Sequence, residues 1–120
     1  IQHLKQTQRD ADYYDVIFTG DLGKYGKELL TYILNDEGYL IKNLADCGAM
    51  YYTDKQKTEQ GGSGAGCASS TLNSFILQKF KCGDYKRVLF VPTGALLSKD
   101  TSLQKQTIPS IAHAVCLESC

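Results

Sequence analysis

The stretch Asp15-Val16-Ile17-Phe18-Thr19-Gly20 is a short apolar run that ends at a glycine, and it decides the class of fold. Directly after it, Asp21 can cap a helix. The apolar positions of that helix share one face at helical spacing; they are Leu22, Leu29, Leu30, Ile33 and Leu34. Turn-forming residues gather from Asn35 to Gly38, where the helix is expected to end. A strand that leads into an amphipathic helix is typical of α/β proteins.

Further elements follow in the same alternation. Gly48–Thr53 predicts a second strand, and Asp54–Gln60 predicts a solvated loop. A helix is expected over Cys67–Phe80, where the apolar side chains cover more than one face, as in a helix buried on several sides. Arg87–Val91 and Ser110–Glu118 predict two more strands with apolar residues on both faces, which is typical of interior strands. The sequence therefore predicts an α/β fold with a mixed β-sheet and helices on both faces.

Length and charge narrow the classes of function. The 120 residues fit one compact domain, residues 1–120. Thirteen basic and thirteen acidic side chains cancel, so the chain lacks the one-signed field of a nucleic-acid binder. No apolar run approaches the ~20 residues needed to cross a bilayer, so any membrane link is expected to come through another protein.

The five cysteines are odd in number, where a disulfide framework would favour an even count, and no CxxC motif is present. We expect reduced, mostly buried thiols. His113, Cys116 and Cys120 could be imagined as a metal site, but strand alternation turns Cys116 to the opposite face from His113. The sequence therefore predicts neither a metal nor a cofactor.

A glycine cluster at the start of the predicted helix over Cys67–Phe80 is the first candidate site. A loop with few side chains at a helix start exposes backbone N–H groups to an anion such as a carboxylate or a phosphate. The cluster lacks the Lys-Ser/Thr of a phosphate-binding P-loop. The alternative is that these glycines only let the helix start close to the sheet. The candidate binding residues are Gly61, Gly62, Ser63, Gly64 and Gly66.

Asp21 and His113 are the other candidates. Asp21 follows the carboxyl end of the first predicted strand, where open α/β sheets tend to place ligands. Its alternative role is that of a helix N-cap. His113 is predicted to share a strand face with Ile111, Val115 and Leu117, and a lone histidine there is more often a core residue than a base or ligand.

Five strings of the chain resemble the stage V sporulation protein AD family and occur in the same order. They are Val16-Ile17-Phe18-Thr19-Gly20-Asp21-Leu22-Gly23, Asp46-Cys47-Gly48, Gly61-Gly62-Ser63-Gly64-Ala65-Gly66-Cys67, Thr93-Gly94-Ala95-Leu96-Leu97-Ser98 and Ile108-Pro109-Ser110-Ile111-Ala112-His113-Ala114-Val115. That family is similar to thiolases and ketoacyl synthases, whose fold repeats one half twice in five layers. The resemblance implies that residues 1–120 are a single C-terminal thiolase-like lobe of a two-lobe protein, a layered αβα half-domain. Cys67–Phe80 would then lie in the central layer, and Arg87–Val91 with Ser110–Glu118 would form the closing antiparallel pair.

The resemblance also implies that the chain is not an enzyme. In thiolase-like enzymes the nucleophilic cysteine lies on the first half, which this chain does not resemble, and the Gly-His-Pro of thiolases is missing around Gly61–Ser70. Cys67 lies at a predicted helix start, which can lower the pKa of a thiol. A thiolate that lacks a nearby base and oxyanion donors is nevertheless a poor catalyst of acyl transfer. We therefore expect no catalytic residues.

The family implies binding of dipicolinic acid, a planar pyridine with two carboxylates. It implies a soluble component of the stage V sporulation A channel, which moves this compound into the forming spore and out at germination. The expected location is the forming spore, peripherally on the cytoplasmic side of its inner membrane. Two alternatives remain open: a remnant acyltransferase, which needs a Cys67 to His113 contact, and a pure interaction module. A homodimer through the exposed helix over Cys67–Phe80 is also expected, because a lobe alone leaves apolar surface open.

Overall fold

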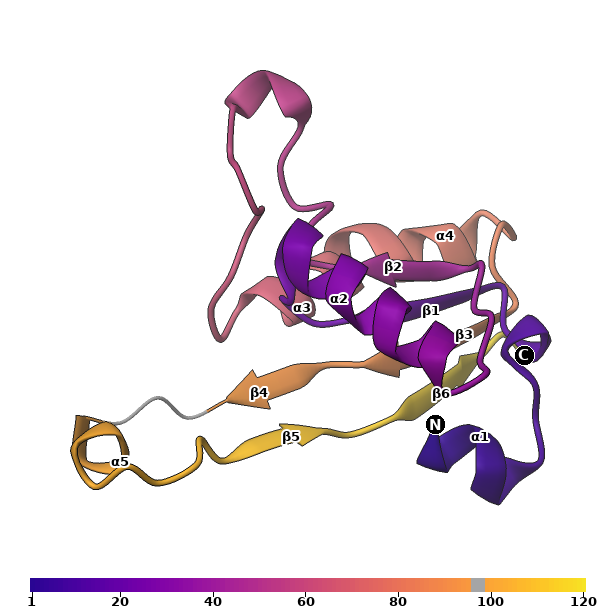
Figure 1. The fold of residues 1–120 in the computed structure, drawn as a ribbon. Coiled ribbons are helices and arrows are strands. Elements are labelled where there is room, and N and C mark those ends of the chain that lie inside the picture. Colours follow the sequence, from indigo (N-terminus) through magenta and orange to yellow (C-terminus); the bar gives the residue numbers. More distant parts are fainter. Residues whose placement is uncertain (96–98) are drawn as a thin grey trace.

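A computed structural model describes residues 1–95 and 99–120 of the chain. Its main sheet has four strands in the order β2-β1-β3-β6 (Figure 1). These strands are β1 (Val16–Thr19), β2 (Leu44–Asp46), β3 (Arg87–Val91) and β6 (Val115–Glu118). β1 pairs in parallel with both β2 and β3, and β6 runs antiparallel to β3. The predicted mixed sheet and its closing antiparallel pair are therefore confirmed.

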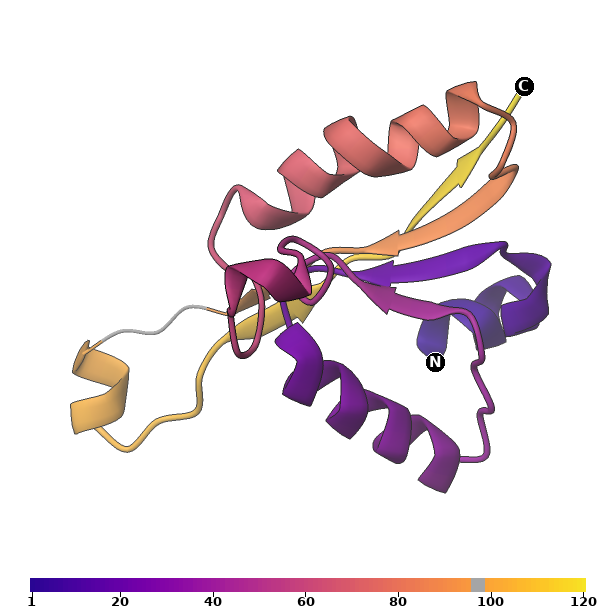
Figure 2. The same cartoon turned by 90° about the horizontal axis from the view of Figure 1, so that it is seen from above.

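Helices cover both faces of this sheet, as predicted (Figure 2). The longest is α2 (Gly23–Asp36), which follows β1. On the other face, α3 (Cys67–Thr71), a π-helical turn η3 (Leu72–Ile76) and α4 (Leu77–Lys81) form one continuous helical segment, α3–α4. The short helices are α1 (Gln2–Thr7), α5 (Lys99–Leu103) and two 3₁₀ turns, η1 (Ala11–Tyr13) and η2 (Asp54–Gln56).

The core has one layer on each side of the sheet because successive strand residues point to opposite faces. Phe18 of β1 packs with Val88 and Phe90 of β3 beneath α3–α4. Ile17 and Leu89 face the other way, in a second cluster that contains residues of the N-terminal segment. This arrangement explains why β1 and β3 carry apolar side chains on both faces.

The prediction of a strand over Gly48–Thr53 is wrong. These residues form turns, and the strand lies earlier, at β2 (Leu44–Asp46). The reason is local hydrogen bonding by Asp46, whose carboxylate accepts the N–H of Ala49 at 2.9 Å. An Asp side chain that accepts the backbone N–H of a residue a few positions later in the chain favours a turn over an extended strand.

The predicted last strand, Ser110–Glu118, is interrupted at His113 and Ala114. Its first part, β5 (Ser110–Ala112), pairs with β4 (Thr93–Ala95) in a separate two-stranded sheet that extends away from the main sheet (Figure 1). Its second part, β6, is an edge strand and half exposed. The expectation of an interior strand is therefore wrong for this segment. The three residues at 96–98, which end one of the matched strings, lie outside the described residues.

Only one side of the helical segment α3–α4 is buried in this chain. Cys67, Thr71 and Ile76 face the core, and Ile76 is completely buried. The opposite side exposes mainly polar residues; they are Ser69, Ser70, Asn73, Ser74 and Gln78. The prediction of a helix over Cys67–Phe80 is confirmed, but burial on several sides is not observed here.

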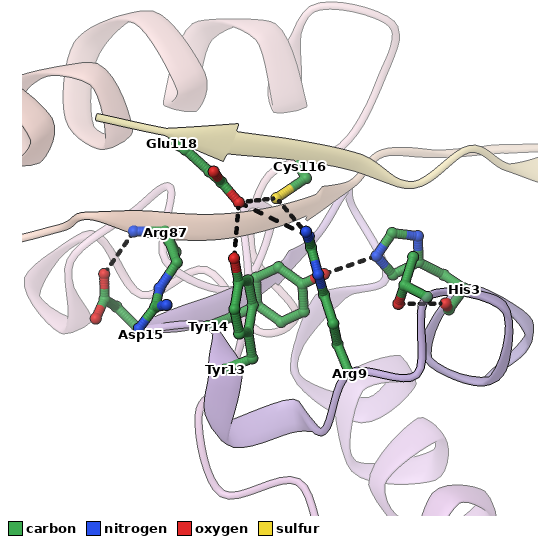
Figure 3. Close-up of polar contacts among 9 residues, drawn as sticks. His3, Arg9, Tyr13, Tyr14, Asp15, Arg87, Cys116 and Glu118 are labelled. Carbon is green, nitrogen blue, oxygen red and sulfur yellow. Dashed lines mark hydrogen bonds and ion pairs between the residues drawn. The ribbon is translucent and has the colours of Figure 1, made fainter. Parts of the chain in front are cut away.

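A cluster of polar and aromatic side chains attaches the N-terminal segment to β3 and β6 of the main sheet (Figure 3). The ring of Tyr13 lies between two guanidinium groups, 4.4 Å from Arg9 and 4.2 Å from Arg87. The Tyr13 hydroxyl donates to Glu118 of β6 at 3.2 Å. Cation–π contacts of this kind stabilise by roughly 0.5–1 kcal/mol each at exposed sites. This cluster holds the start of the chain against β3 and β6.

Two further observations concern the cysteines and the membrane. Cys47 and Cys67 are buried, but Cys82 and Cys120 are exposed, so the prediction of mostly buried thiols is wrong for the latter pair. Within residues 1–95 and 99–120, none of the helices has both the length and the apolar character needed to cross a bilayer.

Candidate functional site

The carboxyl ends of β1 and β2 meet around the buried side chain of Asp46 (1% exposed). One carboxylate oxygen, Oδ1, accepts the Thr19 hydroxyl at 2.6 Å and the Leu22 N–H at 3.0 Å. The other, Oδ2, accepts the N–H groups of Gly23 and Ala49, both at 2.9 Å. Asp46 thus joins the end of β1, the start of α2 and the turn after β2. Four bonds to one carboxylate satisfy a buried charge that would otherwise be costly.

Asp46 also corrects the sequence prediction for the start of α2. The predicted N-cap was Asp21, yet the side chain of Asp21 makes no capping bond. Asp46 accepts the first N–H groups of the helix instead, at Leu22 and Gly23. A negative charge at this place is favourable because a helix N-terminus carries a partial positive charge.

The first two glycines of the loop serve packing. Gly61 has φ +114°, and a Cβ added there would meet the carbonyl oxygen of Gly48. The N–H of Gly62 donates to that same oxygen at 2.8 Å. A Cβ at Gly62 would meet the ring of Tyr51 at 2.8 Å. At these two positions the packing alternative applies, because the loop passes directly over the turn that contains Gly48 and Tyr51.

Gly64 and Gly66 are different because a Cβ at either would meet nothing within 4 Å, although the backbone of Gly64, at φ +106°, still favours glycine. They line an open hollow of about 300 Å³, together with Gly62, Ser63 and two adjacent tyrosines, Tyr51 and Tyr52. The tyrosine rings lie edge to face at 5.2 Å between centroids, and both are well exposed. The hollow therefore combines aromatic surface, loop backbone and the start of α3.

Asp21 lies beside this hollow, and its side chain bonds the glycine loop. Its Oδ2 accepts the N–H of Gly64 at 2.9 Å, and its Oδ1 is 3.4 Å from the Thr93 hydroxyl. A second hollow, of about 500 Å³, lies between Asp21 and the β4–β5 sheet. The structure thus brings Asp21 and the glycine loop together, and Asp21 also lines the second hollow.

The two buried thiols near the loop are held in their neutral form. Burial raises the pKa of Cys47 to about 12, and the neighbouring Asp46 carboxylate adds to the effect. Burial also raises the pKa of Cys67, with further contributions from Asp21 and Asp46. The helix start, which would lower a thiol pKa, is outweighed here by desolvation and by two carboxylates.

His113 does not join this site. It is exposed and lies in the break between β5 and β6, so the predicted face shared with Ile111, Val115 and Leu117 does not form. Its neighbour Ala112 lines the hollow beside Asp21, whereas His113 lines neither of the two hollows described above. The role of His113 as a ligand anchor stays a prediction without support from this geometry.

Sequence reasoning missed three residues of the site. Asp46 appeared only within a matched string, although an acidic residue directly before Cys47 and Gly48 is a signal for a turn. Tyr51 and Tyr52 were assigned to a strand, where they would face opposite sides. In the turn both rings instead line the hollow.

Comparisons with known proteins agree on one family. The model of the family described as stage V sporulation protein AD matches residues 1–118. A curated protein of that name from Bacillus subtilis (strain 168) is 43% identical over 118 residues. The match covers 98% of this chain and 35% of the relative, so the chain spans about a third of the length of that protein.

Proposed function

Because the chain belongs to the stage V sporulation protein AD family, we propose that it is part of a non-catalytic component of the assembly that transports dipicolinic acid. In this proposal the protein works in the forming spore and at germination. It is peripherally associated with the inner membrane through other subunits of the stage V sporulation A channel. In the same proposal, residues 1–120 form the C-terminal lobe of that protein, with the thiolase-like half-fold that the resemblance implies.

The open hollow beside the glycine loop is the observation that carries the ligand proposal. A planar pyridine dicarboxylate needs an aromatic or apolar surface for its ring and N–H donors for its carboxylates. Tyr51 and Tyr52 offer the surface, and the loop over Ser63–Gly66 offers backbone. Since the chain spans about a third of its relative, residues outside 1–120 are proposed to complete the pocket.

Titration of dipicolinic acid into the full-length protein tests this proposal. We expect Gly66→Glu to weaken binding by about tenfold or more, because it adds bulk and a negative charge where the ligand carboxylates would lie. The backbone of Gly66, at φ −92°, accepts a side chain without strain. Isothermal titration calorimetry of both proteins measures the change.

The matched control for this titration is Gln6→Glu, which adds the same charge on the exposed surface of α1, at the other end of the molecule. It should bind like the unmodified protein. Binding by the full-length protein but not by residues 1–120 would place the pocket between lobes. No binding by either would contradict the proposed ligand, and equal binding by Gly66→Glu would move the ligand away from this hollow.

The neutral thiols support the proposal that the protein is not an acyltransferase. A nucleophilic cysteine acts as its thiolate and needs a base within reach. The pKa of Cys67 is raised, and His113 does not line the hollow that Cys67 lines. The acyltransferase alternative requires a contact between Cys67 and His113.

Thiol labelling tests the absence of a nucleophile. At pH 7.5 we expect iodoacetamide to modify exposed Cys82 and Cys120 well before Cys67, because Cys67 is 5% exposed and its pKa is raised by burial. Mass spectrometry of peptides after timed quenching gives the rate at each site. A variant with Cys82→Ser controls for the assignment. Faster labelling of Cys67 than of Cys82 would favour the acyltransferase alternative.

A further inference from the structure

A hollow of about 270 Å³ lies between α1, α2 and one face of the main sheet. Figure 2 shows both helices on this face. In α2 the buried residues are Gly23 and Leu34, and Leu30 is only half-buried, so the helix covers the sheet incompletely. The floor of the hollow consists of strand side chains that point to the same face; they are Ile17, Thr19, Leu44, Leu89 and Val91. Because side chains around a void lose packing contacts, we expect a further group to fill it.

The lining of the hollow fits an aliphatic occupant. Among the described residues that line it, there is no Asp, Glu, Lys or Arg. Two of its polar side chains already bond within the chain. The Thr19 hydroxyl donates to Asp46 at 2.6 Å, and His3 Nε2 shares a hydrogen bond of 2.8 Å with the Tyr14 hydroxyl. A polar ligand needs convergent donors or acceptors to fix its orientation, whereas aliphatic groups need only contact.

A second copy of the chain is a poor occupant of this hollow. A twofold dimer places the same surface patch of each copy face to face. The hollow is concave, so a twofold contact would set one hollow against another and leave both unfilled. The occupant must therefore be a convex segment with a different surface.

The first turn of α1 forms the rim of the hollow, because Ile1, Gln2 and His3 all line it. This turn lacks the features that favour a helix start. Ile1 occupies the N-cap without a side-chain hydrogen bond, and the first turn contains no acidic residue. Residues that continued this helix upstream would supply carbonyl acceptors to its first N–H groups. Such residues would start at the rim of the hollow.

We propose that, in the full-length protein, the residues before Ile1 continue α1 and fill this hollow with aliphatic side chains. The proposal rests on the proposed function, in which residues 1–120 are the C-terminal lobe and the rest of the protein precedes them. The relative has enough additional chain, because the match covers only 35% of its length. Side chains three and four residues apart share one face of a helix. The extension therefore presents to the hollow the same face that Leu4 (7% exposed) buries against the sheet.

Photo-cross-linking in the full-length protein tests this occupant. With p-benzoylphenylalanine in place of Leu30, we expect cross-links to a peptide of the same molecule that lies shortly before Ile1, which tandem mass spectrometry identifies. The matched control places the same group at Tyr32, which is 70% exposed, and should not yield this peptide. Cross-links between molecules, to a lipid or to another part of the chain would overturn the proposal. So would the absence of cross-links in a folded variant.

Thiol labelling is the second measurement, and it does not depend on whether the bulky cross-linker is tolerated. In the full-length protein we expect Leu30→Cys to react with iodoacetamide about 100-fold or more slowly than Tyr32→Cys, because a filled hollow excludes the reagent. Similar rates at the two positions would show an open hollow and contradict the proposal. Titration of dipicolinic acid into the unmodified protein decides the proposed ligand separately, because neither position lines the hollow beside the glycine loop.

Discussion

Replacing Asp46 with alanine is expected to lower the free energy of unfolding by about 3–5 kcal/mol, the largest effect of any single side chain in the site. The carboxylate is buried and accepts four hydrogen bonds from β1, α2 and the turn after β2. Alanine leaves three backbone N–H groups and one hydroxyl without their acceptor. Urea denaturation followed by circular dichroism measures the loss.

Two further variants make this result specific. Asp46→Asn keeps the shape and one acceptor, but its amide NH₂ must face donors whichever way it is turned, because both oxygens accept two bonds. We expect a loss of about 2 kcal/mol. Asp54→Ala removes an acid whose side chain is fully exposed, and it should change stability by less than ~0.5 kcal/mol. Equal stability of the Asp46→Ala protein would show that the carboxylate does not organise the site.

Asp21→Asn is expected to tighten the binding of dipicolinate by about tenfold, provided that the ligand occupies the hollow beside the glycine loop. The Asp21 carboxylate bonds Gly64 at the edge of this hollow, so a bound dianion would lie close to a third negative charge. Asparagine can still accept the Gly64 N–H through its carbonyl oxygen, so the loop keeps its anchor. Calorimetric titration of the full-length protein at about 0.05 and 0.5 M salt measures the gain and its screening.

The charge explanation predicts a definite dependence on salt. The gain from Asp21→Asn should shrink at high salt, because screening weakens the repulsion that the substitution removes. Asp21→Ala removes the charge and the anchor together, so it should gain less than Asp21→Asn. Weaker binding by Asp21→Asn than by the unmodified protein would mean that the ligand uses the carboxylate, for instance through a bridging cation. That result would contradict repulsion as the role of Asp21.

Local sequence patterns predicted the helices and strands in which apolar residues recur at a regular spacing. The first strand, the helix after it and the strand at Arg87–Val91 have the predicted type because apolar spacing follows the period of each element. The predicted apolar face of the helix is only partly right, because Leu34 is buried whereas Leu29 and Ile33 are 49% and 48% exposed. The same reasoning failed at Gly48–Thr53, where two tyrosines and a threonine favour a strand. Hydrogen bonds to Asp46 override that preference. It also failed for His113. The first part of the last predicted strand pairs with β4, and His113 lies in the break between that part and β6.

The sequence by itself determined the α/β class, the mixed sheet with helices on both faces, and the family, because these depend on periodicity and on ordered strings along the chain. Only the tertiary structure decided that Asp46 caps α2, that Asp21 bonds the glycine loop, and that Tyr51 and Tyr52 line the hollow. These contacts join residues 24 and 43 positions apart in the chain, as for Leu22 with Asp46 and Gly64 with Asp21. No local pattern encodes which distant donor a carboxylate will meet, because that depends on how the strands and loops pack.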